Sequence, residues 1–120
     1  MTRKGLYVVL TNCTDAAREA EFNEWYTNMA VPDILASPGF VAATRYRLLG
    51  QRGEGQAKYL TLYEVEVENL EAFSAEHMRT LDERAAQRRA KGRIFDAIEP
   101  FYLAWYEPIT PRITEEAPGA

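Results

Sequence analysis

Residues 58–67 read KYLTLYEVEV, and their strict alternation predicts a β-strand with two unlike faces. One face carries tyrosines and valines, whereas the other ends in Glu64 and Glu66, which favour water. The preceding residues 50–56 contain three glycines and no hydrophobic side chain, so they predict a loop. This loop joins the strand to another strand pattern over residues 40–49, and the two together predict an antiparallel hairpin.

Two further strands lie toward the ends of the chain. Residues 5–12, GLYVVLTN, are short, β-branched and apolar on both parities, which is typical of a central strand buried on both faces. Residues 94–109 supply the last strand, in which aromatic side chains occupy both parities.

Helical patterns separate these strands. Thr14 or Asp15 can cap a first helix whose apolar positions recur at three and four residues, and Pro32 ends or kinks it. Asn69 can cap a single long helix that is acidic toward its start and basic toward its end, and Gly92 stops it.

The resulting order of strand, helix, strand, strand, helix, strand predicts an α+β domain of ferredoxin-like βαββαβ topology. Right-handed crossovers put both helices on one face of a four-stranded antiparallel sheet. The other face would expose apolar side chains, so we expect a homodimer packed sheet to sheet. A chain this short has little core to spare, so we also expect a sizeable ligand cavity to need the partner subunit. The domain is expected over residues 1–108, followed by an extended C-terminal tail over 109–120.

Composition excludes several classes of protein. The chain has 14 basic and 18 acidic residues, and its net charge of −4 argues against a nucleic-acid partner. No apolar run approaches the roughly 20 residues of a membrane helix, and the first residues lead directly into a strand, so a cytoplasmic location without membrane contact is expected. One histidine and one cysteine do not assemble a zinc site, and no phosphate-binding loop is present, so neither a metal nor a cofactor is expected.

Two segments carry a family resemblance. Residues 21–26, EFNEWY, and 31–40, VPDILASPGF, resemble the signature of the EthD-like dimeric α/β-barrel proteins. The resemblance implies a cofactor-independent enzyme, such as a dehydratase, cyclase, isomerase or monooxygenase, acting on a hydrophobic or aromatic metabolite. The family segment usually reads W-Y-x-x-x-H-x-P-D, but here Ala30 stands in place of the histidine, and a methyl group cannot transfer protons. The protein therefore either catalyses with other groups, or is a non-catalytic metabolite-binding or structural dimer protein.

Three residues are candidates for catalysis. His77 shares a helix stripe with Leu70 and Phe73, so its imidazole should face the sheet or the pocket, as an acid or base, a ligand of haem iron, or a packed core residue. Tyr63 could orient a ligand's carbonyl or hydroxyl group. Asp33 is expected either to cap the turn after Pro32 or to act as a catalytic carboxylate.

The remaining tyrosines on strands, including Tyr7 and Tyr59, are candidates for ligand binding or for a subunit interface. Asn12 closes the first strand and Trp25 lies on the first helix, where each could reach a ligand or serve capping and core packing instead.

Arg45 and Arg47 lie two residues apart and so project from the same sheet face. They could together bind a carboxylate or enolate beside the tyrosines of the neighbouring strand. The alternative is cross-strand pairing with Glu64 or Glu66, and a shift of one residue in register decides between the two.

Overall fold

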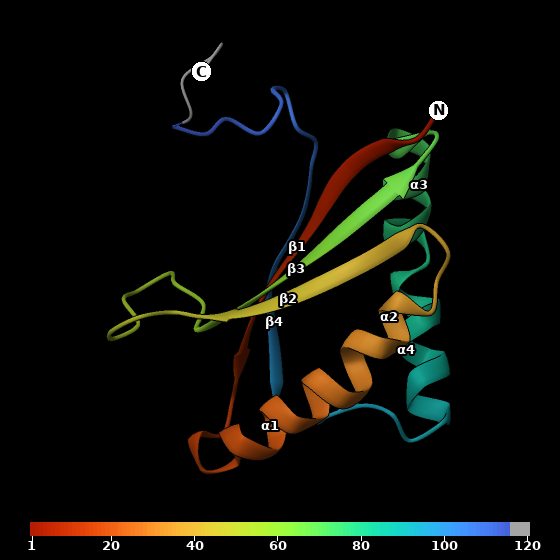
Figure 1. The fold of residues 1–120 in the computed structure, drawn as a ribbon. Coiled ribbons are helices and arrows are strands. Elements are labelled where there is room, and N and C mark those ends of the chain that lie inside the picture. Colours follow the sequence, from red (N-terminus) through yellow and green to blue (C-terminus); the bar gives the residue numbers. More distant parts are fainter. Residues whose placement is uncertain (116–120) are drawn as a thin grey trace.

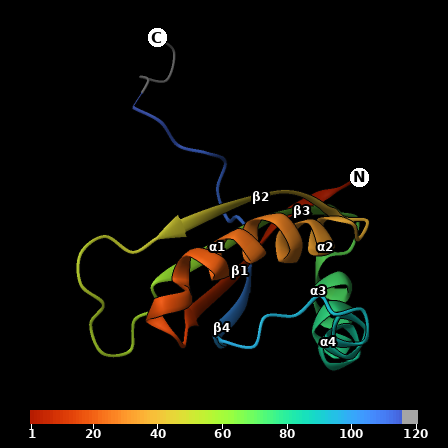
Figure 2. The ribbon, with the colours of Figure 1, turned by 90° about the horizontal axis from the view of Figure 1, so that it is seen from below.

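A computed structural model describes residues 1–115 as an open sheet with helices on one of its faces (Figure 1). The elements follow in the order β1 (Arg3–Cys13), η1 (Ala16–Arg18), α1 (Glu19–Trp25), η2 (Tyr26–Ala30), α2 (Val31–Leu35), β2 (Phe40–Arg47), β3 (Tyr59–Val67), α3 (Leu70–Arg79), α4 (Leu81–Ala90) and β4 (Ile98–Tyr106). The loop between β2 and β3 and the helices α3 and α4 lie at opposite ends of the molecule (Figure 2).

The sheet has four strands in the order β2-β3-β1-β4, and all neighbours are antiparallel. β1 lies in the interior between β3 and β4, as its apolar character on both parities predicts. This strand order, with a helical crossover after β1 and another after β3, is the ferredoxin-like arrangement, so the predicted fold class is confirmed.

The two faces of the sheet differ in chemistry. On the helix-covered face, Tyr7 and Val9 of β1 lie beside Tyr63 and Val65 of β3, and all four are buried. On the other face, called here the open face, the exposed glutamates of β3 reach solvent as its alternation predicts.

The first helical run continues past Pro32. Asp15 caps it as predicted, because its Oδ1 accepts a hydrogen bond from the Ala17 N–H at 3.0 Å. Of the two predictions for Pro32, that it ends the helix is wrong, because helical structure continues. η2 is a π-helical turn in which the N–H of Val31 reaches the carbonyl of Tyr26, and Pro32 then lies in the first turn of α2. A proline in a first turn needs no backbone N–H, and the wider turn before it makes room for the ring.

The second helical segment is two helices rather than the one predicted. Thr80 separates α3 from α4, with φ −98° and ψ 9°. Its hydroxyl donates toward the carbonyl oxygens of Glu76 and His77, each at 3.1 Å, and such back-bonding bends helices. Gly92, with φ +67°, follows the end of α4 as predicted.

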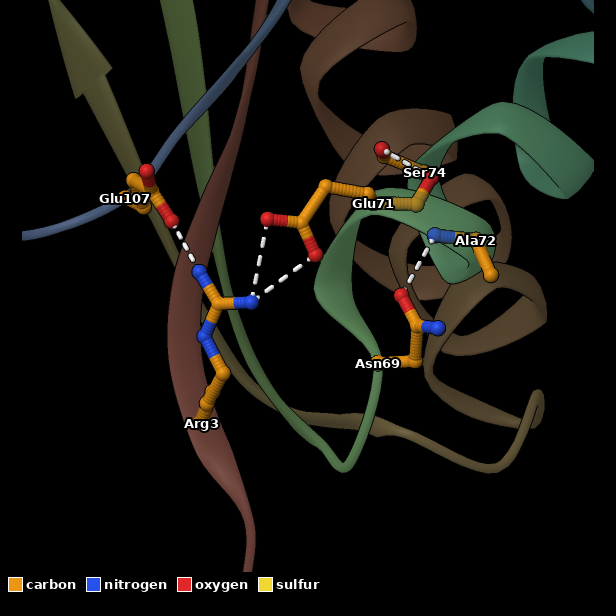
Figure 3. Close-up of polar contacts among 6 residues, drawn as sticks. All are labelled: Arg3, Asn69, Glu71, Ala72, Ser74 and Glu107. Atoms are coloured by element: carbon orange, nitrogen blue, oxygen red, sulfur yellow. Dashed lines mark hydrogen bonds and ion pairs between the residues drawn. The ribbon is translucent and has the colours of Figure 1, made fainter.

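The start of α3 is tied to the sheet (Figure 3). Asn69 caps the helix through its Oδ1, which accepts from the Ala72 N–H at 2.9 Å. Glu71 in the first turn pairs with Arg3 of β1 at 2.8 Å, and Arg3 also contacts Glu107. All three side chains are largely exposed, so these ion pairs orient the helix more than they stabilise it.

Residues 107–115 leave the sheet without regular secondary structure. Ile109 and Ile113 are 93% and 81% exposed, so these two apolar side chains are not buried against the rest of residues 1–115. Residues 116–120, the end of that tail, lie outside the described residues. Within residues 1–115, the helices are all too short and too polar to cross a lipid bilayer.

Candidate functional site

A cavity of about 280 Å³, called here the main cavity, lies between the helices and the sheet. Its floor comes from the helix-covered sheet face, and its walls come from both helical runs. The lining residues discussed below are Tyr7, Trp25, Tyr26, Ala30, Tyr63, His77, Arg84 and Arg88. These residues form a cavity within a single chain, and the expectation that a partner subunit contributes to it stays a prediction.

His77 enters the main cavity from α3. Leu70, Phe73 and His77 recur at three and four residues, which places the imidazole on the helix face that meets the sheet, as predicted. The residue is only 2% exposed. Its ring lies edge-on to Tyr7 at 4.9 Å and to Trp105 at 5.6 Å between ring centroids. Neither ring nitrogen has a hydrogen-bond partner within the described part of the chain, so His77 is packed but unsatisfied.

The electrostatic surroundings keep this imidazole neutral. Burial lowers the pKa of His77 to about 4, and the positive charges of Arg84 and Arg88 act in the same direction. At neutral pH one ring nitrogen is therefore a donor and the other an acceptor. A neutral, unsatisfied imidazole can accept a proton or hydrogen-bond a ligand.

Two phenols face the same space. Tyr7 and Tyr63 are directly opposite each other on β1 and β3, with ring centroids 5.8 Å apart. Burial raises the pKa of Tyr7 to about 12, and it raises the pKa of Tyr63 further, helped by the neighbouring Tyr26. Both hydroxyls therefore stay protonated at neutral pH and can donate hydrogen bonds to a ligand oxygen.

The first helical run contributes Trp25 and Ala30 to the cavity. The Trp25 indole N–H donates to the Arg93 carbonyl oxygen at 3.2 Å, which fixes the ring against the loop before β4. Ala30, the position at which EthD-like sequences usually have histidine, also faces this cavity. The cavity therefore lacks an imidazole from η2 but gains one from α3.

Asp33 lies outside the main cavity. Its carboxylate binds Arg93 through both oxygens, at 2.6 and 2.9 Å. α2 has no side-chain cap, so the prediction that Asp33 caps the turn after Pro32 is wrong. The Arg93 guanidinium is the stronger partner because the contact joins two opposite charges in a bidentate geometry. No observation brings Asp33 near His77 or the phenols.

Asn12 and Tyr59 also lie outside the main cavity, where they connect elements. The Asn12 Oδ1 accepts from the Lys58 N–H at 2.8 Å, which ties the end of β1 to the start of β3. The Tyr59 hydroxyl donates to a Glu19 carboxylate oxygen at 2.7 Å and accepts from Asn23 at 3.1 Å. The polar groups of Asn12 and Tyr59 therefore bond to neighbouring segments of the same chain.

Arg45 and Arg47 project toward the helix-covered side but do not line the main cavity. Arg45 donates to the Thr27 hydroxyl at 3.1 Å and lies 4.5 Å above the Tyr26 ring, and burial lowers its pKa. Arg47 is exposed at the strand end. Pairing with Glu64 or Glu66 does not occur, because the register places Arg45 opposite Thr61 and both glutamates on the open face.

Comparison with known proteins assigns the family. The sequence profile described as "Domain of unknown function (DUF4286)" matches residues 4–108. The chain belongs to the DUF4286 family. No curated protein matches the sequence at a significant level.

Solved structures share the fold of this DUF4286 chain at low sequence identity. HapK from Hahella chejuensis is 15% identical with a TM-score of 0.59, over 92% of this chain and 97% of that one. A "putative monooxygenase" from Shewanella loihica PV-4 is 14% identical with a TM-score of 0.55, over 92% and 99%. An EthD family protein from Bacillus halodurans C-125 is 20% identical with a TM-score of 0.51, over 89% and 99%. The EthD-like resemblance seen in the sequence is therefore confirmed at the level of the fold.

Sequence reasoning missed three residues of the site in this DUF4286 chain. Tyr26, Arg84 and Arg88 line the main cavity. In the sequence, the two arginines are interpreted only as the basic end of a helix, and Tyr26 only as part of the EthD-like segment 21–26. The spacing of Leu81, Arg84 and Arg88 could have revealed a shared helix face pointing inward. Within residues 1–115, no cluster of three or more histidine, cysteine or acidic side chains is placed to hold a metal ion.

Proposed function

We propose that this protein is a cofactor-independent enzyme that moves a proton within a small hydrophobic or aromatic substrate bound in the main cavity. The observation that carries the proposal is His77, a neutral imidazole that is 2% exposed, has no partner for either nitrogen within the described residues, and lines a cavity with two protonated phenols. A buried polar group without a partner costs stability, which is typical of a group reserved for a ligand.

The proposed reaction is an isomerisation or elimination next to a carbonyl group. His77 accepts the proton as a C–H bond beside the carbonyl breaks, and the electron pair of that bond forms the enolate. The Tyr7 and Tyr63 hydroxyls donate hydrogen bonds to the enolate oxygen, where negative charge develops. In an isomerisation, His77 then returns the proton to another atom of the substrate. In an elimination, the electron pair of the enolate expels a leaving group, which takes up the proton from His77.

Oxygenation would begin with the same step. The enolate carbon would give electrons to molecular oxygen and form a peroxide, which would lose water as its O–O bond breaks and leave a second carbonyl on the substrate. This outcome accords with the Shewanella loihica neighbour, which is described as a "putative monooxygenase". Oxygen consumption by the wild type, measured with an electrode in the presence of substrate, separates this outcome from isomerisation.

The test is hydrogen–deuterium exchange at the acidic carbon of 2-tetralone and related aromatic ketones in D₂O, followed by NMR. We expect the wild type to accelerate exchange over buffer and His77→Phe to lose about 100-fold or more of the acceleration. Met78→Leu, a change at an exposed neighbour on the same helix, is the matched control and should keep it. Equal acceleration by wild type and His77→Phe would contradict the role of His77.

A second candidate is a non-catalytic metabolite-binding protein. Ala30 favours it, because the position that usually supplies an imidazole carries a methyl group toward the cavity. Saturable ligand binding without exchange in any ketone of the panel would select this candidate.

The proposed assembly is a homodimer that buries the open face. β1 and β3 present half-buried leucines there, and Tyr46, Tyr102 and Tyr106 are 50–52% exposed. An apolar sheet face of this kind is typical of an interface, and a second copy of the chain can cover it around a two-fold axis.

A further inference from the structure

A second hollow adjoins the main cavity. This basic cleft, of about 230 Å³, lies between α2 and α4 and is lined by Asp33, Ala36, Arg84, Gln87, Arg88, Lys91 and Arg93. Arg84 and Arg88 line both hollows. The two spaces therefore meet at a pair of guanidinium groups.

No acidic side chain among the described residues forms an ion pair with these two guanidinium groups. Asp33 is held by Arg93, and neither Arg84 nor Arg88 forms an ion pair within residues 1–115. The arginines lie four residues apart on α4, a spacing at which like charges destabilise a helix. Both are half-buried, so solvent relieves this repulsion only in part.

Neutral hydroxyl groups hold Arg84 in place. Its Nε donates to the Thr80 hydroxyl at 2.9 Å and its Nη1 to the Ser37 hydroxyl at 3.1 Å. These contacts orient the guanidinium without cancelling its charge, and its remaining N–H groups stay available. The positive charges reach the cavity floor, since those of Arg84 and Arg88 help to lower the pKa of His77 and oppose part of the rise that burial causes in the pKa of Tyr7.

We infer that the ligand carries a carboxylate, which Arg84 and Arg88 bind where the two hollows meet while the apolar body of the ligand lies against Tyr7, Tyr63 and His77. The inference rests on the proposed function, because it names the substrate class of the same cavity. A carboxylate is favoured over a phosphate because Asp82, an acidic side chain that also lines the cavity, would repel a doubly charged phosphate more than a singly charged carboxylate.

An anionic ligand would also activate His77. Neutralising the two arginines removes part of the field that lowers the pKa of the imidazole, so the bound substrate makes His77 a stronger base. The other titratable groups that share this cavity are Tyr7, Tyr26, Tyr63 and Asp82. These four groups line the cavity both before and after the ligand binds, so the expected change in the pKa of His77 comes from the ligand's charge.

The test compares the binding of 2-naphthoate, the uncharged 2-naphthamide and 2-naphthyl phosphate by calorimetry. We expect the wild type to prefer naphthoate over naphthamide by about 10- to 100-fold. Arg88→Gln and the double variant Arg84→Gln/Arg88→Gln should lose most of that preference. Arg89→Gln is the matched control, since Arg89 is exposed on the same helix and lines neither hollow. Its preference should be unchanged.

Three results would overturn the inference: equal affinity for acid and amide, the same preference in Arg88→Gln as in the wild type, or no binding of any probe. Tighter binding of the phosphate than of the carboxylate would overturn the assignment to a carboxylate. NMR of the single histidine gives a readout that a merely structural role would not move: naphthoate should raise its pKa, and naphthamide should not.

Failure of this inference differs from failure of the proposed function. Naphthoate preference without deuterium exchange would support the anion site and contradict catalysis. In a second exchange assay with a ketone that carries a carboxylate, such as 2-tetralone-6-carboxylate, exchange that depends on His77 but is unaffected by Arg88→Gln would support catalysis and contradict the anion site.

Discussion

The imidazole of His77 is buried without partners, and this affects stability as well as chemistry. An unsatisfied buried polar group costs about 1–3 kcal/mol, so His77→Phe should raise the free energy of unfolding at pH 7 by about that amount. The adjoining cavity leaves space for the larger ring. Because the same substitution should abolish deuterium exchange, a variant that is more stable and inactive would show that the histidine is kept for function.

The free energies of unfolding of the wild type and of His77→Phe should diverge as the pH falls. The folded pKa of His77 is lowered to about 4, whereas an unfolded histidine titrates near 6.5, so the unfolded state binds the extra proton between these values. Wild type should therefore lose up to about 3 kcal/mol relative to His77→Phe between pH 6.5 and 4. Urea denaturation of both proteins across this range measures the gap, and a constant gap would contradict the lowered pKa.

At the scale of elements, Gly39 joins α2 to β2 in a conformation that side chains resist. Its φ is +106°, and an added Cβ would lie 2.7 Å from the Phe73 ring and 2.8 Å from Val67. Gly39→Ala should therefore cost about 2–5 kcal/mol from backbone strain and overpacking together. Gly55→Ala, at φ +76° with nothing within 4 Å, isolates the backbone part and should cost about 1–2 kcal/mol. Equal losses in urea denaturation would show that the packing at Gly39 contributes nothing.

The elements also show what the sequence could predict. Strand parity placed Tyr59 and Tyr63 on one face of β3 correctly, because alternation is a local property, but it could not place Tyr7 of β1 on the same side. It could not say that this is the helix-covered face, or that Tyr59 would be engaged by Glu19 and lie outside the main cavity, because helix placement is a tertiary property. The break at Thr80 was missed for a similar reason, since threonine at this position is compatible with a continuous helix.

The missed part of the site lies across that break. With α3 and α4 as separate helices, His77 at the end of one and Arg84 and Arg88 on the next line a single cavity. The sequence had suggested Arg45 and Arg47 as the anion-binding pair, on the correct side of the sheet. Arg45 donates to Thr27 and lies over the Tyr26 ring, and its Nε and Nη2 have no hydrogen-bond partner in the described residues. Among the arginines of residues 1–115, only Arg84 and Arg88 of α4 line the main cavity.

At the scale of the whole molecule, assembly and ligand binding should be separable. The homodimer would use the open face, whereas every residue of the main cavity lies on the helix-covered side of one chain. Leu62 sits on the open face of β3 opposite Val8, so Leu62→Lys would put a charge into the proposed interface. We expect analytical ultracentrifugation to find a dimer for the wild type and a monomer for this variant. Ala86→Lys, with the same new charge on the exposed side of α4, should stay dimeric.

The monomeric variant should nevertheless bind 2-naphthoate with the affinity of the wild type, because the residues proposed to bind it all line a cavity on the side of the sheet away from the proposed interface. A loss of binding that accompanies the loss of the dimer would mean that the second subunit completes or supports the site. A wild type that sediments as a monomer would instead remove the homodimer, and would leave the apolar open face to some other partner.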